Sequence, residues 1–171
     1  MKIGIVIDNL NLARGGQQVW VAGLAEKLIA RGDEVHVVAG RFDDVLVEKL
    51  GIIAHHVRLT RSKILFARAV EKKLRSLNLD IIHDTGNGWY CDLMNPHYGS
   101  RKTAVKNRIL LLPPWAQPFK RAMTWLLPRY WELAYTARRQ FVDDGRKIVA
   151  ISEVVAQNFI DDYQIAPSRI R

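Results

Sequence analysis

Gly15 and Gly16 are placed where a phosphate group could bind. They lie between an apolar run over residues 3–7, typical of a buried strand, and the helix that follows. Glycine lets the backbone approach a ligand closely, and a helix N-terminus offers free N–H groups with a partial positive charge. A diphosphate would suit this place, and a tight strand-to-helix turn would explain the same pair equally well.

Polar side chains follow the other expected strands. His97 could orient an acceptor hydroxyl or contact a sugar donor, although a lone histidine is more often structural. Asp84 could bind acceptor hydroxyls or cap the glycine-containing turn in which it lies with Asn87. Ser152 and Glu153 follow the last clear strand. Because ligands of open α/β sheets bind beyond the carboxyl ends of the strands, we take these last four residues as acceptor-side candidates.

The sequence lacks the residue patterns for dinucleotide binding, metal binding and thiol catalysis. The glycines do not form G-x-G-x-x-G or a Walker A loop, and no acidic residue ends the second strand, which disfavours a dinucleotide-dependent oxidoreductase. The pair His55-His56 has no cysteine or carboxylate at metal-ligand spacing, so no metal is assigned. Cys91 is the only cysteine and has no activating neighbour in the sequence.

Alternating strands and helices must position these residues. Strands are expected over 3–7, 34–39, 53–59, 80–83, 92–97 and 147–151. Helices are expected between Gly16 and Arg31-Gly32, over 43–50 and 64–77, and from a Ser152 cap to about Tyr163. This pattern predicts one domain over residues 1–171 with a doubly wound, mostly parallel α/β sheet.

Residues 100–147 interrupt this alternation with prolines and aromatic side chains. They predict two or more helices separated at Pro113, Pro114, Pro118 and Pro128. The segment holds eleven Lys or Arg against three Asp or Glu, a net charge of +8, whereas the rest of the chain carries +1. The basic character of the protein therefore belongs to this insertion and indicates an anionic partner for it.

Cysteine content and hydropathy indicate the compartment. A single cysteine excludes an intrachain disulfide framework, as expected in a reducing compartment. The start lacks a signal peptide pattern, and no run approaches the roughly 18 apolar residues of a membrane span. We therefore expect a cytoplasmic protein.

An ordered set of motifs resembles the amino-terminal domain of family 4 retaining glycosyltransferases, which have the GT-B fold. Lipopolysaccharide-core glucosyltransferases look most similar, since they too carry a basic, aromatic insertion in this half. The set spans the chain from end to end and comprises Met1–Val6, Gly15–Ala25, Leu28–Val38, Asp80–His83, Ile148–Glu153 and Tyr163–Ile170.

The resemblance implies roles for individual residues. Gly15 and Gly16 match the loop that approaches the diphosphate of the nucleotide-sugar donor, and His97 matches a catalytic-site histidine near the donor sugar and acceptor hydroxyl. The family's carboxyl-terminal donor-binding domain, with its Glu-x7-Glu motif, is absent from this sequence. The resemblance implies that no cofactor is needed, because the family needs no divalent metal.

The resulting expectation is half of a hexosyltransferase that acts on a glycolipid or oligosaccharide and is inactive alone. The alternative is a non-catalytic basic α/β module that binds an anionic surface, either membrane or nucleic acid. Nucleic acid is disfavoured because the aromatic residues lie among prolines and leucines. Aromatic rings prefer the lipid headgroup zone, and cations bind anionic lipid. The expected contacts with the inner leaflet of the plasma membrane are Lys106, Arg108, Trp115, Lys120, Arg121 and Trp125, unless the aromatic residues form a core.

Overall fold

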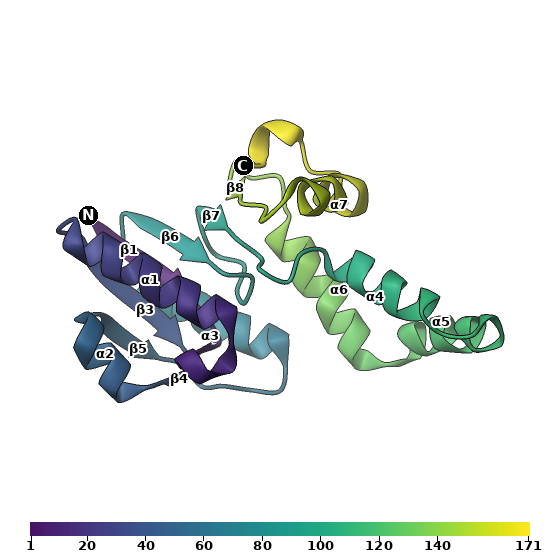
Figure 1. The fold of residues 1–171 in the computed structure, drawn as a ribbon, viewed down its shortest axis with the longest axis horizontal. Helices are drawn as coiled ribbons and strands as arrows, with labels where there is room; N and C mark the ends of the chain where they lie inside the picture. Colours follow the sequence, from purple (N-terminus) through teal and green to yellow (C-terminus); the bar gives the residue numbers. More distant parts are fainter.

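The computed structural model describes all 171 residues and combines a parallel sheet with a projecting group of helices (Figure 1). The sheet has six parallel strands in the order β5-β3-β1-β6-β7-β8. Their bounds are β1 (Lys2–Val6), β3 (Glu34–Ala39), β5 (Ile53–His56), β6 (Ile81–Asp84), β7 (Leu93–Met94) and β8 (Lys147–Ile148). The strands β2 (Asn9–Leu10) and β4 (Arg41–Phe42) form a separate parallel pair.

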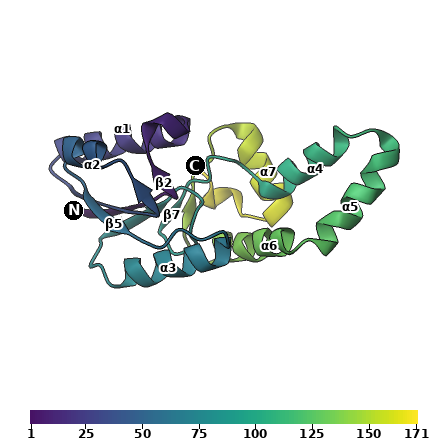
Figure 2. The same cartoon turned by 90° about the horizontal axis from the view of Figure 1, so that it is seen from below.

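Helices cover both faces of the sheet, as the sequence predicts. The helices α1 (Gly16–Ala30) and α2 (Asp44–Leu50) lie on one face, and α3 (Lys63–Arg75) lies on the other (Figure 2). One core cluster contains Ile5 and Val21, and a second contains Val6 and Phe66. Neighbouring residues of β1 therefore point into different cores, which explains why this strand is apolar throughout. The doubly wound α/β class is confirmed.

The strand order places a switch point between β1 and β6. The chain moves from β1 outward to β3 and β5, and then returns to build β6, β7 and β8 on the other side of β1. Loops after β1 and β6 therefore diverge at their carboxyl ends, where Val6 is paired with Asp84. Ligands of such sheets bind in this crevice.

The projecting helices form an arm between β7 and β8 (Figures 1 and 2). The arm consists of α4 (Arg101–Leu110), α5 (Gln117–Leu126) and α6 (Pro128–Gln140), with a short 3-10 turn (Pro114–Ala116) before α5. The prolines separate the helices as predicted, although Pro118 lies inside the first turn of α5, where a missing N–H is tolerated. No helix in the chain combines the length and apolarity that crossing a bilayer requires.

Polar contacts attach the arm to the rest of the protein. At its base, the Thr103 hydroxyl of α4 donates to the Asp162 carboxylate of α7 (Glu153–Tyr163) at 2.6 Å. The Ser62 hydroxyl, before α3, donates to the Glu132 carboxylate of α6. These contacts hold the arm near its base, although its far end extends beyond the sheet.

The later strands are shorter than the sequence predicts. The strand expected over 53–59 ends at His56, the one expected over 92–97 is only Leu93–Met94, and the one expected over 147–151 ends at Ile148. Both β5 and β8 lie at sheet edges, and β8 pairs with only the two residues of β7. Local apolar character does not reveal how many partner residues an edge strand has.

Candidate functional site

The glycine loop after β1 begins α1 without any side-chain cap. Gly15 has φ +147°, a conformation that residues with a Cβ rarely adopt, and it is the N-cap of the helix. No side chain accepts from the first N–H groups of α1, and its first turn has no acidic residue. A Cβ built at Gly16 has no heavy atom within 4 Å. The helix start is therefore an exposed, uncompensated positive end, as an anion site requires.

The turn after β6 lies against this loop. Thr85 donates from its hydroxyl to the Val6 carbonyl at 2.7 Å, which holds the turn at the end of β1. The side-chain amide of Gln17, in the first turn of α1, donates to the Thr85 carbonyl at 2.9 Å. The loops that follow β1 and β6 are thereby brought together at the switch point.

His97 lies in the same region and packs against α1. The Trp20 ring meets the His97 ring edge-on with centroids 4.7 Å apart, and it meets the His83 ring at 5.4 Å. The Nε2 atoms of both histidines are buried without a hydrogen-bond partner. Since Trp20 is one helical turn beyond Gly16, His97 lies near the start of α1, and its joint action with the glycine loop stays a prediction.

Burial keeps both imidazoles neutral. Burial lowers the pKa of His97 below its ordinary value of 6.5. Deeper burial, together with the neighbouring His97, lowers the pKa of His83 to about 4. A neutral imidazole can accept a hydrogen bond from a hydroxyl, so His97 has the protonation state needed to position an acceptor.

Asp84 serves the turn that follows β6. Its carboxylate is fully buried and accepts from the backbone N–H groups of Gly86, Asn87 and Gly88 at 2.7–2.8 Å. Burial raises the pKa of Asp84 to about 6, against the opposing effect of these hydrogen bonds. The sequence left two roles open for Asp84, which were binding acceptor hydroxyls and capping the turn. The geometry shows the capping role, and no part of this carboxylate is exposed to an acceptor.

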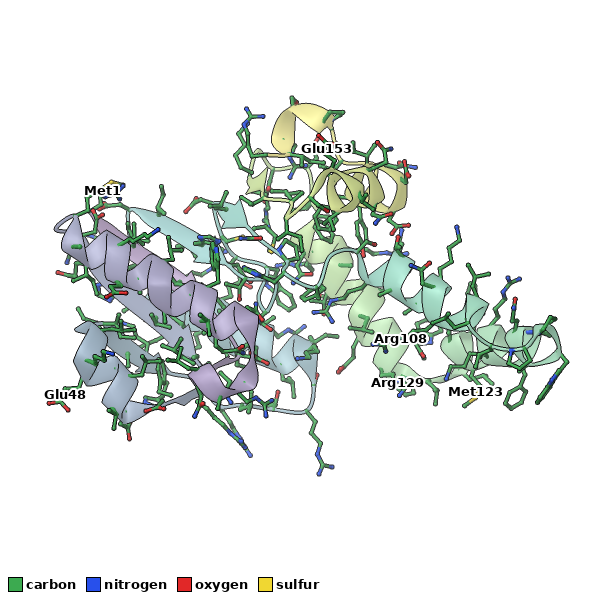
Figure 3. The ribbon with its side chains drawn as sticks, viewed as in Figure 1. Met1, Glu48, Arg108, Met123, Arg129 and Glu153 are labelled. Carbon is green, nitrogen blue, oxygen red and sulfur yellow. The ribbon has the colours of Figure 1, made fainter.

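The other acceptor-side candidates are more accessible. Asn87 is half-buried, and its side-chain amide donates to the Thr85 hydroxyl at 3.1 Å. Ser152 caps α7 by accepting from the Val155 N–H, and Glu153 is exposed in the first turn of that helix (Figure 3). Val155 lies against Gly99, two residues after His97. These residues therefore surround the same edge of the sheet, and their contact with an acceptor stays a prediction.

Trp20 and His83 are site residues that were not singled out from the sequence. A tryptophan on an amphipathic helix is usually a core residue, yet Trp20 is 38% exposed. The sequence feature that could have identified Trp20 as a site residue is its position one turn after a glycine-rich helix start. The contact with two histidines depends on β6 and β7 standing beside α1, which residue spacing does not reveal.

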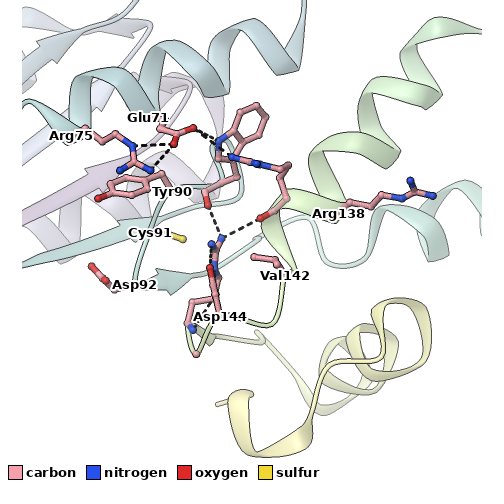
Figure 4. Close-up of a pocket in the computed structure, with 12 residues that line it drawn as sticks. Glu71, Arg75, Tyr90, Cys91, Asp92, Arg138, Val142 and Asp144 are labelled. Carbon is pink, nitrogen blue, oxygen red and sulfur yellow. Dashed lines mark hydrogen bonds and ion pairs between the residues drawn. The ribbon is translucent and has the colours of Figure 1, made fainter.

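A second polar cluster lies between α3 and α6 and has a structural role. It lines a cavity of about 680 Å³ (Figure 4). Trp89 donates from its indole N–H to Glu71 at 2.6 Å, and the Arg75 guanidinium lies 4.3 Å from the centre of the Tyr90 ring. Arg146 donates to the Trp89 carbonyl at 2.6 Å and to the Asp144 carboxylate. The guanidinium of Arg139, in α6, lies 5.3 Å from the centre of the Trp89 ring, so the cluster also links the arm to α3 and the sheet.

Metal and thiol chemistry lack an evident centre. No three side chains of His, Cys, Asp or Glu come together as metal ligands would, and the expectation of metal-independent catalysis stays a prediction. Burial raises the pKa of the Cys91 thiol well above its usual value, which suppresses the reactive thiolate.

Comparison with solved structures identifies proteins with this fold. The crystal structure of WaaG, a glycosyltransferase involved in lipopolysaccharide biosynthesis, matches with a TM-score of 0.78 and 16% identity, covering 99% of this chain and 44% of that one. A glycosyltransferase from Rickettsia africae ESF-5 matches with a TM-score of 0.53 and 15% identity, covering 99% and 41%. The chain thus spans less than half the length of either protein. A comparison with curated protein sequences gives no significant match.

A family model gives the decisive sequence evidence. The model of Glycosyltransferase Family 4 matches residues 14–171, which begin at the glycine loop and include β6, His97, the arm and α7. The expected GT-B amino-terminal fold is confirmed by this match together with the structural likeness to WaaG. The chain belongs to Glycosyltransferase Family 4.

Proposed function

We propose that this chain is the acceptor-side half of an enzyme that moves a hexose from a nucleotide-sugar to a glycolipid or oligosaccharide. The observation that carries the proposal is the meeting of the uncapped α1 start with neutral His97 at the switch point. The helix start offers a site for the donor diphosphate, and His97, through Nδ1 because its Nε2 is buried, offers an acceptor for a hydroxyl proton. The catalysis we propose needs no metal, because helix dipoles and basic side chains stabilise the leaving diphosphate.

The biological context we propose is bacterial cell-surface polysaccharide or lipopolysaccharide synthesis. WaaG, whose fold the chain shares, is a glycosyltransferase involved in lipopolysaccharide biosynthesis. A donor-binding carboxyl-terminal domain would complete the enzyme and supply pockets for the base and ribose. We place the protein at the cytoplasmic leaflet of the plasma membrane, where a lipid-anchored acceptor would be found.

Sugar transfer by the complete protein tests this proposal. Radiolabelled nucleotide-sugars are incubated with the protein and a bacterial glycolipid extract, and label is measured in the lipid fraction. Transfer from at least one donor is expected. If no donor supported transfer, the chain would instead be the non-catalytic module that binds an anionic surface.

Substitution of the glycine loop should weaken donor binding in the complete protein. A valine at Gly16 meets open space in this structure, so the fold should persist, whereas its side chain would enter the proposed diphosphate path. Losing one hydrogen bond to a charged group costs about 1.5–3 kcal/mol, which predicts a donor KM about 10- to 100-fold higher. Steady-state kinetics at varied donor concentration measure this.

The matched control is Gly23→Val, since a Cβ at Gly23, in the middle of α1, also has no heavy atom within 4 Å. Gly15→Val is less informative, because the φ of +147° would strain any side chain. Unchanged donor kinetics in a folded Gly16→Val protein would mean that the two glycines only form a turn.

The arm supports a second proposal, that it binds the surface of an anionic membrane. The helix α5 has no buried residue, although Phe119, Met123 and Leu126 line one face of it. Trp115 and Trp125 are 81% and 74% exposed, so these aromatic side chains do not form a core. Exposed aromatic and apolar groups beside cations are typical of surfaces that lie in the headgroup region.

The basic candidates share the arm with these side chains. Lys106, Arg108 and Arg121 are exposed, and Lys120 is half-buried. Figure 3 shows Arg108 and Arg129 on the arm, far from Glu48 at the opposite end of the molecule. Each basic residue near an anionic leaflet contributes about 1 kcal/mol. A few of them, together with the tryptophans, would hold the protein reversibly at the membrane.

Co-sedimentation with liposomes tests the arm. Binding is expected with anionic vesicles and not with zwitterionic ones, and it should fall as salt rises. Changing Lys106, Arg108, Lys120 and Arg121 to Glu should weaken binding on the order of 100- to 1,000-fold. The control makes the same charge change at exposed residues of the sheet region, Lys27, Lys49, Arg68 and Lys72. Equal loss in both variants, or equal binding to both vesicle types, would contradict an arm-specific contact.

A further inference from the structure

The arm contains a cavity of about 640 Å³ between α4, α5 and α6. Its walls are mainly apolar and include Val105 and Ile109 of α4 with Leu133 and Ala137 of α6. Tyr163 of α7 lines it as well. Its volume falls in the range of sites that bind small molecules, and the apolar walls suit a hydrocarbon group.

The end of the cavity nearest α7 has unpaired hydrogen-bond donors. The Arg101 Nε and the Tyr163 hydroxyl are buried and have no hydrogen-bond partner. Buried polar groups are nearly always hydrogen-bonded, so two unpaired groups in one cavity indicate a missing ligand. The lining also includes Lys102, Lys106 and Arg121 and no acidic residue. The missing group is therefore expected to be an anion.

The other end of the cavity opens among exposed apolar residues. Leu110 and Trp125 both line the cavity, yet they are 52% and 74% exposed. Because α4 runs from Arg101 to Leu110, one helix connects the anion-binding end to this apolar mouth. The mouth is part of the surface that we propose to lie at the membrane, so a hydrocarbon chain could enter it directly from the bilayer.

From these three features we infer that the cavity binds a phosphate-bearing lipid. Its phosphate lies at Arg101 and Tyr163, and one alkyl chain lies between α4 and α6. The inference rests on the proposed function for the position of the arm at a membrane. The Arg101 guanidinium is 4.0 Å from the centre of the Tyr98 ring, next to His97. A phosphate held there would lie beside the candidate catalytic edge, as the lipid part of an acceptor should.

Titration calorimetry with dodecyl phosphate, kept below its micelle concentration, tests the cavity. The chain should bind dodecyl phosphate more tightly than either inorganic phosphate, which lacks the alkyl chain, or dodecyltrimethylammonium, which has the opposite charge. Tight binding is expected only when the phosphate and the alkyl chain are present in the same molecule. Binding no tighter than that of these two compounds would overturn the inference.

Two substitutions that fill the cavity from opposite walls locate the binding. Val105→Trp on α4 and Ala134→Trp on α6 should each weaken dodecyl phosphate binding by at least about tenfold, the equivalent of excluding two methylene groups. Ala104→Trp is the control, since Ala104 is an exposed residue of α4 that does not line the cavity. If both fillings bound like the control, the ligand would lie elsewhere and the inference would fail.

The Tyr163→Phe variant tests the head-group end. It removes only a hydroxyl that has no partner in the free protein, so the unfolding midpoint should not fall. Affinity for dodecyl phosphate should fall about tenfold, because a hydrogen bond to a charged group is lost. Unchanged affinity would mean that the phosphate does not bind at this end of the cavity, and the inference would be overturned.

Arg108 and Lys120 separate this inference from the membrane proposal, because they belong to the arm but do not line the cavity. Changing both to Glu should weaken vesicle binding and leave dodecyl phosphate binding unchanged. A failure of vesicle binding alone would remove the membrane proposal, whereas the cavity inference fails only on dodecyl phosphate. In the complete protein, competition between dodecyl phosphate and the glycolipid would show that the lipid bound in the cavity is the acceptor. Lack of competition would show that it is a phospholipid of the membrane.

Discussion

Replacing His97 by alanine in the complete protein is expected to lower turnover by about 10²- to 10⁴-fold, the usual contribution of a general acid–base or positioning group. His97 follows β7 and packs edge-on against Trp20, beside the start of α1. It makes no hydrogen bond through Nε2 that its removal would break. Stability should therefore change much less than activity. Initial rates at saturating substrate and thermal unfolding midpoints measure the two effects.

The matched control is His56→Ala. His56 is an exposed histidine at the end of β5, the edge strand on the other side of the sheet. Its ring packs edge-on against Phe42, with centroids 4.6 Å apart. The control should retain normal turnover. If His97→Ala also retained near-normal turnover, His97 would be a packing residue and its match to the family's catalytic histidine would be wrong.

The pH dependence of turnover follows from the same residue. The charged form of His97 is disfavoured by burial, so its pKa is lowered and the neutral form persists below the ordinary value of 6.5. If neutral His97 accepts the proton, activity should be full above that lowered pKa and should fall as pH drops through it. The acid limb of the pH–rate profile should therefore lie below 6.5 and disappear in the alanine variant.

The sequence predicts the parts of the fold that local patterns determine. The strand over Glu34–Ala39 has the predicted bounds, and Asp43 and Ser152 cap the helices expected after them. These features depend on apolar runs and on capping residues within a few positions of each other. The glycine loop and His97 were placed at the carboxyl edge because consecutive parallel strands share that edge.

Features that depend on distant contacts could not be predicted. The spacing of Trp20 on its helix is compatible with an ordinary core residue, and only the assembled sheet brings it to His83 and His97. Similarly, the capping role of Asp84 depends on whether the turn closes over its carboxylate. The sequence also could not predict that Trp125 is exposed, because an amphipathic helix has the same sequence pattern whether its apolar face is covered or not.

The second large expected effect is that the 171-residue chain alone transfers no sugar, whereas the complete protein does. The chain spans 44% of WaaG, and neither of the two cavities described above contains Gly15, Gly16 or His97. The helix start could contact a diphosphate, but the base and ribose of a donor would remain in solvent. Donor binding should therefore be weak, and the reacting atoms would lack the positioning that contributes about 7–11 kcal/mol to catalysis.

The assay of label transfer to glycolipid measures this directly, with equal concentrations of the chain and the complete protein. The His97→Ala form of the complete protein provides the matched background, because it lacks only the proposed catalytic side chain. Turnover by the chain should not exceed that background. Robust transfer by the chain would show that donor and acceptor sites both lie within these residues, and the assignment as half of an enzyme would then be wrong. Adding the separate carboxyl-terminal half should restore activity only if the two halves associate across the carboxyl edge of the sheet, where the α1 start is open.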